Sequence, residues 1–213
     1  MTRDPWILAT RNVGKLRELR ALFAEAALEV IDLAQAGIDE RPEEEGIEVH
    51  GTFEGNAVAK ARYYAARAGG RPVVADDSGL EVAALGDEPG VHSKRWSGRG
   101  DLYGTRLDAA NNALLLERLQ GKSDWSARFV CAAAWCAGAE SVVVRGEVPG
   151  RIVATGVGSE GFGYDPHFFA LELGRTLGEA TVREKQQVSH RGRAFALLLD
   201  ALRARDVLAR ADE

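Results

Sequence analysis

The sequence predicts an α/β protein folded as one domain. Short apolar runs alternate along the chain with longer segments of helical periodicity, which is the pattern of strands and helices in α/β folds. The 213 residues suffice for one large domain with a full core, or for two small ones. No repeat, linker or low-complexity stretch interrupts the chain. We therefore expect a single domain over residues 1–213.

Composition and charge limit the classes of function. The net charge of −5 argues against a broad nucleic-acid-binding surface, although a local basic cluster can hold phosphate on an acidic protein. The sequence contains no run of 18 or more apolar residues, so it predicts no membrane span. Met1–Trp6 lacks a signal-peptide pattern. We expect a cytoplasmic protein without a nucleic-acid or membrane partner. Cys131 and Cys136 lie in one apolar run, which predicts buried thiols.

The first predicted strand, turn and helix form a candidate phosphate site. The apolar run Trp6–Ala9 precedes the polar turn Thr10–Lys15, and apolar residues then recur at helical spacing from Leu16 to Phe23. Free amides and the helix dipole at such a helix start attract anions. The turn adds two hydrogen-bonding side chains and a lysine, but it lacks the glycine spacing of a Walker A loop. The alternative is an ordinary helix cap with a solvated lysine.

An acidic loop and a helix follow. Leu28–Leu33 predicts a strand, and the loop Asp39–Gly46 comes after it. Acidic runs are usually solvated, but carboxylates are also the oxygen ligands that Mg²⁺ accepts together with substrate phosphates. Thr52–Ala68 predicts a helix on which Asn56 and Lys60 lie four apart, on one face beside the apolar stripe.

Two adjacent carboxylates, Asp76 and Asp77, follow the apolar run Val73–Ala75, which predicts a buried strand. Ligands of α/β sheets gather beyond the carboxyl ends of strands. Neighbouring side chains of an extended chain point to opposite faces. We therefore expect one carboxylate to face an open cleft and the other to turn into the fold. The alternative is a strand that ends in an acidic turn, because Asp-Ser-Gly is ordinary turn chemistry.

The second half of the chain predicts a helix and a hairpin. Thr105 and Asp108 suggest a capping box for a helix that runs to about Gln120. Ala127–Trp135 and Ser141–Val148 predict two strands joined near Gly138, and a turn is expected over residues 146–150.

Two further segments are candidates for contacts with a base or an anion. Residues 156–161 match G-x-G-x-x-G, but no helix start follows, so a glycine loop is the better interpretation. Phe162 or Tyr164 in that loop could stack on a base, or could simply be buried. The basic segment Thr181–Arg193 ends in Ser189–Gly192 at the start of a predicted C-terminal helix, where an anion or a base edge could bind. A solvated basic segment is the alternative.

Together these features suggest metal-assisted attack of water on a nucleotide phosphate. Five motifs in order also resemble the inosine triphosphate pyrophosphatase family, which acts on non-standard purine nucleotides such as dITP and XTP. The resemblance runs from Ile7 to about Leu202. The motifs are Thr10–Lys15, Phe53–Ala57, Ala75–Leu80, Gly161–Pro166, and Glu184–Lys185 with Ser189–Gly192.

The resemblance implies an elongated α/β domain with a long twisted mixed sheet flanked by helices, in which two lobes enclose a central substrate cleft. It implies a homodimer. It also implies Mg²⁺-dependent hydrolysis of purine nucleoside triphosphates (ITP, dITP, XTP) to the monophosphate and pyrophosphate.

By position, the resemblance implies that Asp77 is the general base and a metal partner. A glutamate of the acidic loop would complete the Mg²⁺ site, with Glu43 and Glu44 as candidates beside Glu45. The choice stays open because residues 46–51 form a longer segment than the family usually has. Arg11 stands where the family commonly has glycine. The residues expected to contact substrate are Thr10, Arg11, Asn12, Val13, Gly14, Lys15, Ser78, Phe162, Gly163, Tyr164, Asp165, Lys185, His190 and Arg191.

Two alternatives remain from the sequence. A Maf-type nucleotide pyrophosphatase uses a similar sheet, but its N-terminal Ser-x-x-Arg-Arg pattern is absent here. A nucleotide-binding or RNA-binding module without catalysis is the second alternative. Asp77, the acidic loop and Lys15 argue against it.

Overall fold

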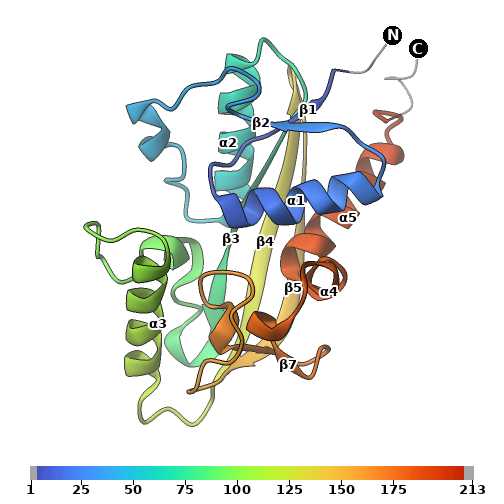
Figure 1. The fold of residues 1–213 in the computed structure, drawn as a ribbon. Helices are drawn as coiled ribbons and strands as arrows, with labels where there is room; N and C mark the ends of the chain where they lie inside the picture. Colours follow the sequence, from blue (N-terminus) through green and yellow to red (C-terminus); the bar gives the residue numbers. More distant parts are fainter. Residues whose placement is uncertain (1–3, 209–213) are drawn as a thin grey trace. The chain divides into compact units, whose positions relative to one another are not determined.

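The computed structural model describes residues 4–208 and contains a seven-stranded sheet with the order β2-β1-β3-β4-β5-β6-β7 (Figure 1). β1 pairs in parallel with β2 and with β3, whereas β6 is antiparallel to β5 and to β7. The predicted α/β class and mixed sheet are therefore confirmed. The strands are β1 (Trp6–Leu8), β2 (Val30–Asp32), β3 (Val73–Val82), β4 (Ser126–Ala137), β5 (Glu140–Ile152), β6 (Phe168–Ala170) and β7 (Arg175–Thr176). The helices are α1 (Val13–Glu25), α2 (Phe53–Arg67), α3 (Thr105–Leu119), α4 (Val182–Val188) and α5 (His190–Arg203).

The chain groups into two compact units, neither of which is one continuous stretch. Unit 1 comprises the residues up to Asp77, Cys131–Gly146 and the residues from Arg191 onward. Unit 2 comprises Ser78–Val130 and Glu147–His190. Among residues 4–208, no helix combines the length and the apolar character that crossing a membrane requires.

The core of unit 1 follows from the alternation of side chains along its strands. Leu8 of β1 and Val74 of β3 pack with Phe23 of α1 and Phe195 of α5 in one buried cluster. Val73 and its alternate neighbours in β3 are also buried, and they point to the other face. Helix α2 buries its stripe of alanines and aromatic rings in the same unit. Figure 1 shows α1 crossing in front of the strands.

Unit 2 has its own apolar core, formed by strand and α3 side chains. The rings of Phe129 and Phe168 lie with their centroids 4.5 Å apart at its centre. Phe168 has no exposed surface, and the same holds for Leu80, Val82, Leu115, Leu119, Val148, Ala170 and Leu177.

Three local predictions are wrong. β3 continues to Val82, so the two aspartates lie inside a strand and not beyond its end. The expected turn at residues 146–150 belongs to β5, where Gly150 pairs with Ala170. A Cβ on this glycine would lie 2.4 Å from the ring of Phe168, so the glycine permits close packing within a strand.

The third wrong prediction is the capping box of α3. The N-cap is Gly104, at φ 56°, and no side chain caps the helix. Asp108 instead accepts a hydrogen bond from the amide of Gly163, at 3.0 Å. By contrast, α1, α2 and the hairpin of β4 and β5 lie where the sequence predicts them. Cys131 and Cys136 are buried free thiols, as expected.

Candidate active site

The two aspartates of β3 point to opposite faces of the sheet, as the sequence predicts. Asp76 shares the face of Val74, where α1 and α5 pack. Asp77 shares the face of Ala75 and bonds to α2 through Asn56. Both side chains are buried, at 0% and 7% exposure. The strand thus sends one carboxylate to each layer of helices in unit 1.

Asp76 lies in a buried ion-pair network. Its Oδ2 is 3.0 Å from Lys15 Nζ and 3.2 Å from Arg191 Nε, and Arg191 also pairs with Glu18. Burial opposes the charge of Asp76, but Lys15 and Arg191 outweigh it and hold the pKa of this carboxyl well below its usual range. The ion pairs thus favour the ionised form of Asp76, and it is the carboxylate that turns into the fold.

Asp77 has a different electrostatic environment. Asn56 Nδ2 donates a hydrogen bond to its Oδ2 at 2.8 Å. Burial raises the pKa of Asp77 above its usual value, and the carboxylate of Glu48 raises it further, against the lowering effect of Lys15 and Lys60. A carboxylate with a raised pKa accepts a proton more readily, which suits a general base.

Glu48 belongs to the same charge cluster, although it was not among the residues expected from the sequence. It forms an ion pair with Lys60, a residue that is itself 9% exposed. Burial opposes the charge of Glu48, but Lys60 and Lys15 hold its pKa below the usual value. The pattern of Asn56 and Lys60 on one helix face was a usable signal, because polar side chains beside an apolar stripe need buried partners.

The turn between β1 and α1 combines an ordinary cap with a partly buried lysine. Thr10 Oγ1 accepts from the amide of Asn12 at 3.2 Å, and Asn12 Oδ1 accepts from the amide of Lys15 at 3.0 Å. Asn12 is thus the N-cap of α1. The ammonium of Lys15 forms an ion pair with Asp76, so Lys15 is not the freely solvated lysine of the alternative interpretation. The first-turn amides of Val13 and Gly14 have no intrahelical acceptor, and Val13 is 80% exposed.

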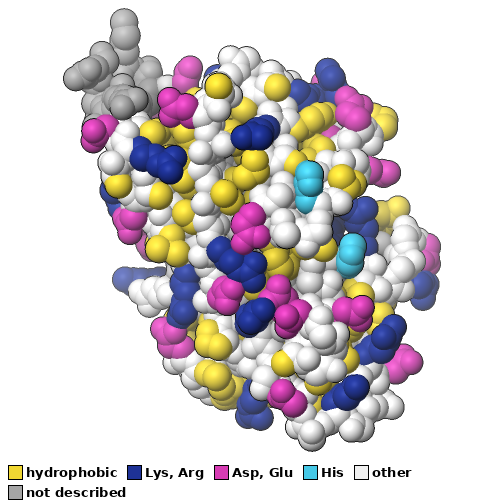
Figure 2. Space-filling view, turned by 180° about the vertical axis from the view of Figure 1, so that it is seen from behind, with side chains coloured by type: hydrophobic (Ala, Val, Ile, Leu, Met, Phe, Trp, Pro, Cys, Tyr) yellow, Lys and Arg dark blue, Asp and Glu magenta, His cyan; other side chains and the backbone are white. Residues whose placement is uncertain are grey.

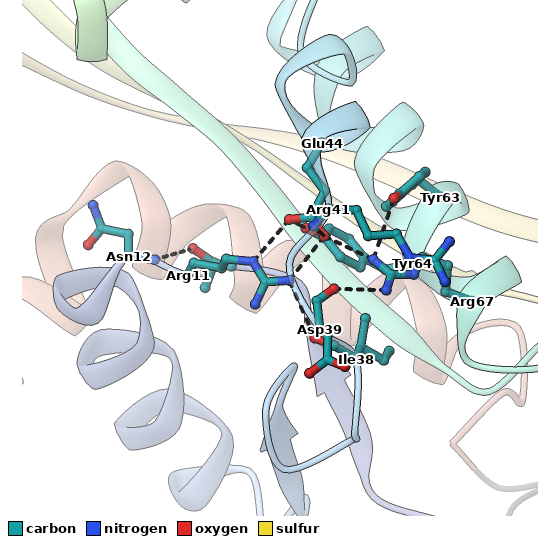
Figure 3. A network of polar contacts seen from close by, with 10 residues as sticks. Arg11, Asn12, Ile38, Asp39, Arg41, Glu44, Tyr63, Tyr64 and Arg67 are labelled. Carbon is teal, nitrogen blue, oxygen red and sulfur yellow. Dashed lines mark hydrogen bonds and ion pairs between the residues drawn. The ribbon is translucent and has the colours of Figure 1, made fainter. Parts of the chain in front are cut away.

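Arg11 contacts one of the predicted acidic ligands, Glu44, in unit 1. Arg11 makes a two-pronged contact with Glu44, with Nε 2.9 Å from Oε2 and Nη2 3.0 Å from Oε1 (Figure 3). Glu43 lies 3.6 Å from Arg41, and both side chains are more than half exposed. Glu45 is exposed. Metal binding by these glutamates stays a prediction, and so does a substrate contact of Arg11.

The loop that the sequence predicts to contact the base lies in unit 2, and a buried ion pair holds it in place. Lys185 Nζ is 2.9 Å from Asp165 Oδ2, and each side chain is 4% exposed. The same oxygen accepts from the amide of Phe162 at 2.7 Å. Gly161, at φ 77°, is required here, because a Cβ would lie 2.1 Å from that oxygen. Gly163 is held by α3, since Asn112 Nδ2 donates to its carbonyl at 2.9 Å.

The aromatic side chains of this part of unit 2 differ in exposure. Tyr164 is buried, and its hydroxyl donates to the carbonyl of Ser93 at 2.8 Å, so its ring belongs to the core. Phe162 is half-buried, with Lys185 Nζ 5.3 Å from its ring centre, and it is the better candidate for stacking on a base. The buried ring of His190 stacks on Phe129 at 4.7 Å. Ser78 is half-buried in β3.

Unit 1 can supply some, but not all, of the ligands of a divalent cation. Within residues 4–208, no group of three or more His, Cys, Asp or Glu side chains has the geometry to enclose a metal. Mg²⁺ usually takes only one or two carboxylates and completes its shell with water and substrate phosphates. Asp77 and Glu48 fit this requirement, because they are two carboxylates of one charge cluster, in which Glu48 raises the pKa of Asp77. The buried Oδ1 of Asp76 has no hydrogen-bond partner among the described residues, but Asp76 lies on the other face of β3 from Asp77.

Comparison with known proteins identifies the family. The model of the Ham1 family matches residues 6–201. The dITP/XTP pyrophosphatase of Mycobacterium tuberculosis (strain H37Rv) is 52% identical over 200 residues, which cover 93% of this chain and 95% of the relative. That of Bordetella parapertussis is 43% identical over 201 residues, which cover 93% of this chain and 91% of the relative.

Solved structures agree with this assignment. The Ham1 protein of Staphylococcus aureus is 36% identical, with a TM-score of 0.77 over 95% of this chain and 100% of that chain. The nucleoside-triphosphatase, or dITP/XTP pyrophosphatase, of Mycobacterium abscessus is 42% identical, with a TM-score of 0.67 over 93% of this chain and 100% of that chain. The resemblance predicted from the five motifs is confirmed, and the chain belongs to the Ham1 family.

Proposed function

We propose that this protein hydrolyses non-standard purine nucleoside triphosphates, such as dITP, XTP and ITP, to the monophosphate and pyrophosphate. The observation that carries the proposal is the difference between the electrostatic environments of Asp76 and Asp77 in β3. Asp77 has the raised pKa of a base, and Asp76 forms an ion pair with Lys15. The family assignment and the dITP/XTP pyrophosphatase names of the relatives support the reaction class.

The chemistry follows from the groups of unit 1. Asp77 takes a proton from a water molecule as that water attacks the α-phosphorus. A P–O bond forms to the water oxygen, the bond from the α-phosphorus to the bridging oxygen breaks, and pyrophosphate leaves. Lys15 and the first-turn amides of α1 hold the triphosphate, because helix N-termini and ammonium groups attract phosphate.

Mg²⁺ is the cofactor that fits these residues. Asp77 and Glu48 would hold it, and its charge would offset the negative charge that builds on the phosphate oxygens. Glu48 is a better candidate than the sequence-predicted Glu44, because Glu48 shares the charge cluster of Asp77 while Glu44 is bound by Arg11. The ion pair of Lys60 with Glu48 keeps this carboxylate ionised when the metal is absent.

Discrimination among bases is the second part of the proposal. Hypoxanthine and xanthine carry an acceptor at C6, where adenine carries a donor. Donors on the enzyme that face this position would lose their partner with adenine, at a cost of about 1–3 kcal/mol for each unpaired buried group. From the sequence, His190 and Arg191 are the candidates for such donors. In the structure Arg191 belongs to unit 1 and contacts Asp76 and Glu18, whereas Lys185 and His190 belong to unit 2 together with the predicted base-contacting loop, so we regard these two as the stronger candidates.

The remaining proposals concern assembly and location. We propose a homodimer in the cytoplasm, and light scattering on the purified protein tests the dimer. Figure 2 shows Lys, Arg, Asp and Glu side chains interspersed over the face that it draws. A mixed surface of this kind gives no support to the alternative of an RNA-binding module, which would favour a basic patch or stripe.

A substrate panel tests the proposed function. Pyrophosphate release is measured with dITP, XTP, ITP, ATP and GTP, with Mg²⁺ and with an excess of EDTA. We expect kcat/KM for dITP, XTP and ITP to exceed that for ATP by at least about tenfold, the effect of one unpaired group. We also expect EDTA to abolish the activity. Equal values for ITP and ATP would contradict the base assignment, and absence of pyrophosphate with every nucleotide would contradict the function.

A further inference from the structure

Glu44 is the centre of a cluster that it forms with Arg11, Tyr64 and Arg67 (Figure 3). Besides its two-pronged contact with Arg11, Glu44 accepts from the hydroxyl of Tyr64 at 2.7 Å and from Arg67 Nη1 at 2.9 Å. The amide of Arg41 adds a bond to Oε1 at 3.3 Å. One carboxylate thus joins the β1–α1 turn, helix α2 and its own 3₁₀ turn, Pro42–Gly46.

This arrangement leaves Glu44 little capacity for a metal. A carboxylate offers about four lone-pair sites, and here both oxygens already accept from charged or hydroxyl donors. Burial opposes its charge, but the hydrogen bonds from Arg11 and Tyr64 hold the pKa of Glu44 below its usual value. A cation bound directly to Glu44 would have to displace these partners and would meet two guanidinium groups.

The loop that carries Glu44 has no apolar anchor of its own. Ile38 and Phe53 are buried at 5% and 3% exposure, but no residue from Asp39 to Thr52 is buried. Polar contacts must therefore order these residues. Arg67 and Arg11 of the Glu44 cluster make further polar contacts with this segment. Arg67 Nη2 donates to the carbonyl of Asp39 at 2.8 Å, and Arg11 Nη2 donates to the carbonyl of Ile38 at 3.3 Å.

Glu48 lies four residues beyond Glu44 in this loop. It reaches Lys60 on α2, and the amide of His50 donates to Asn56 Oδ1 at 2.8 Å. These contacts fix the end of the loop, whereas the Glu44 cluster fixes its beginning. With both ends held, the carboxylate of Glu48 has a defined place in the charge cluster of Asp77.

We propose that Glu44 is a positioning residue for the divalent cation and acts through Glu48. The Glu44 cluster orders residues 39–52, so that Glu48 is held in place before the cation binds. This inference rests on the proposed function, because it takes Glu48 and Asp77 as the metal ligands. Arg11 then serves to fix the loop in this chain, at a position where the sequence resemblance implies a glycine in other members.

The decisive variant is Arg67→Ala, because it distinguishes a positioning role of Glu44 from direct metal binding by Glu44. Mn²⁺ is the probe, and its free concentration is measured by electron paramagnetic resonance during titration of the purified protein. We expect Arg67→Ala and Glu44→Gln each to raise the Kd for Mn²⁺ by about tenfold, as loss of a partner that orients a ligand does. If Glu44 were itself a ligand, Glu44→Gln would weaken binding, but removal of the Arg67 cation would leave it unchanged or strengthen it.

Two further variants keep the test decisive. Tyr64→Phe removes only the hydroxyl that bonds to Glu44 and keeps the buried ring, so it replaces Arg67→Ala if that variant does not fold. Asp101→Asn is the control, because it breaks an exposed two-pronged pair with Arg99 in unit 2 and should leave the Kd unchanged. Hydrogen exchange should rise over residues 39–52 in the Glu44 cluster variants alone.

The outcomes separate this inference from the proposed function. If the wild-type protein releases pyrophosphate from dITP but Mn²⁺ affinity is the same in all variants, the positioning role is wrong and the function stands. If the wild-type protein binds Mn²⁺ and the variants weaken it, but no nucleotide is hydrolysed, the positioning role stands without the reaction. Absence of Mn²⁺ binding to the wild-type protein at millimolar concentration would overturn the proposal.

Discussion

Asp76 and Asp77 are neighbours in one strand, yet they lie in opposite electrostatic environments. Asp76 faces α1 and α5, where Lys15 and Arg191 contact one of its oxygens and lower its pKa. Asp77 faces α2, where burial and Glu48 raise its pKa. The alternation of a β-strand is the whole cause of the separation, because it directs each side chain to a different layer of helices.

The difference shows how one strand can carry one carboxylate that stabilises the fold and another that takes part in the reaction. A carboxylate whose charge is fully compensated contributes to the fold and gives up its proton too readily to serve as a base. A carboxylate whose charge is poorly compensated destabilises the fold, but it holds a proton more firmly. On this account Asp76 fastens Lys15 and Arg191 in place, while Asp77 carries the reaction.

The largest expected effect is on stability. Asp76→Asn should lower the free energy of unfolding by about 3–5 kcal/mol, because it leaves buried cations without their partner. Asp77→Asn should leave the free energy of unfolding unchanged or higher at neutral pH, since it removes a charge that the fold disfavours. Urea unfolding of both variants in EDTA measures this, and equal losses of stability would contradict the comparison.

Lys15 links the two sides of the strand, because it pairs with Asp76 and also lowers the pKa of Asp77. Lys15→Ala should reduce kcat/KM for dITP by about 10–150-fold, which corresponds to the 1.5–3 kcal/mol of a hydrogen bond to a charged group. Lys122→Ala removes an exposed lysine of unit 2 and is the control. Wild-type kcat/KM in a folded Lys15→Ala protein would return Lys15 to a purely structural role.

Glu48→Gln tests the metal side of Asp77. The Mg²⁺ concentration for half-maximal activity should rise by at least about tenfold, because even loss of an outer partner of a metal ligand costs about 10–100-fold in affinity. Glu45→Gln alters an exposed carboxylate of the same loop and should leave that concentration unchanged. If Glu45→Gln raised this concentration and Glu48→Gln did not, the metal ligand would be a glutamate of the 3₁₀ turn and not Glu48.

The smallest expected effect is a difference in pH dependence, measured in metal-free protein. The pKa of Asp76 is lowered by folding, so its contribution is present above the unfolded pKa and is lost as the pH falls below about 4. The pKa of Asp77 is raised, so its ionisation costs stability above that pKa, and the cost disappears as the pH falls. The stability gained by Asp77→Asn should therefore shrink toward acid pH, and so should the stability lost by Asp76→Asn. A constant difference across pH 3–7 (about one unit below the usual pKa to neutrality) in either variant would show that the aspartate in question keeps an ordinary pKa.

Local patterns predicted much of unit 1. Apolar periodicity located α1 and α2, and the alternation rule placed Asp76 and Asp77 on opposite faces. The Thr10–Lys15 turn has the helix cap that the sequence offered as the alternative to a phosphate site. These features depend on neighbours within one turn of helix or one strand, which is the range over which a sequence pattern carries information.

Contacts between distant segments could not be predicted in the same way. Nothing local to Glu44 reveals that it meets Arg11 and Arg67, 33 and 23 residues away, so its part in this cluster could not be predicted. Glu48 was missed because its partner Lys60 lies 12 residues on. Likewise, Asp108 was expected to cap its own helix, but Gly163, 55 residues away, supplies its amide partner.

Turnover of dITP by Asp77→Asn and Asp76→Asn, measured side by side under single-turnover conditions with saturating Mg²⁺, tests the central claim most directly. The account predicts that Asp77→Asn folds normally and loses at least about a hundredfold in the rate of hydrolysis, since a general base contributes about 10²–10⁴-fold. It predicts that Asp76→Asn, where folded, keeps a rate closer to that of the wild-type protein. Near-wild-type turnover in Asp77→Asn, or loss of turnover in Asp76→Asn alone, would contradict the assignment of the two aspartates.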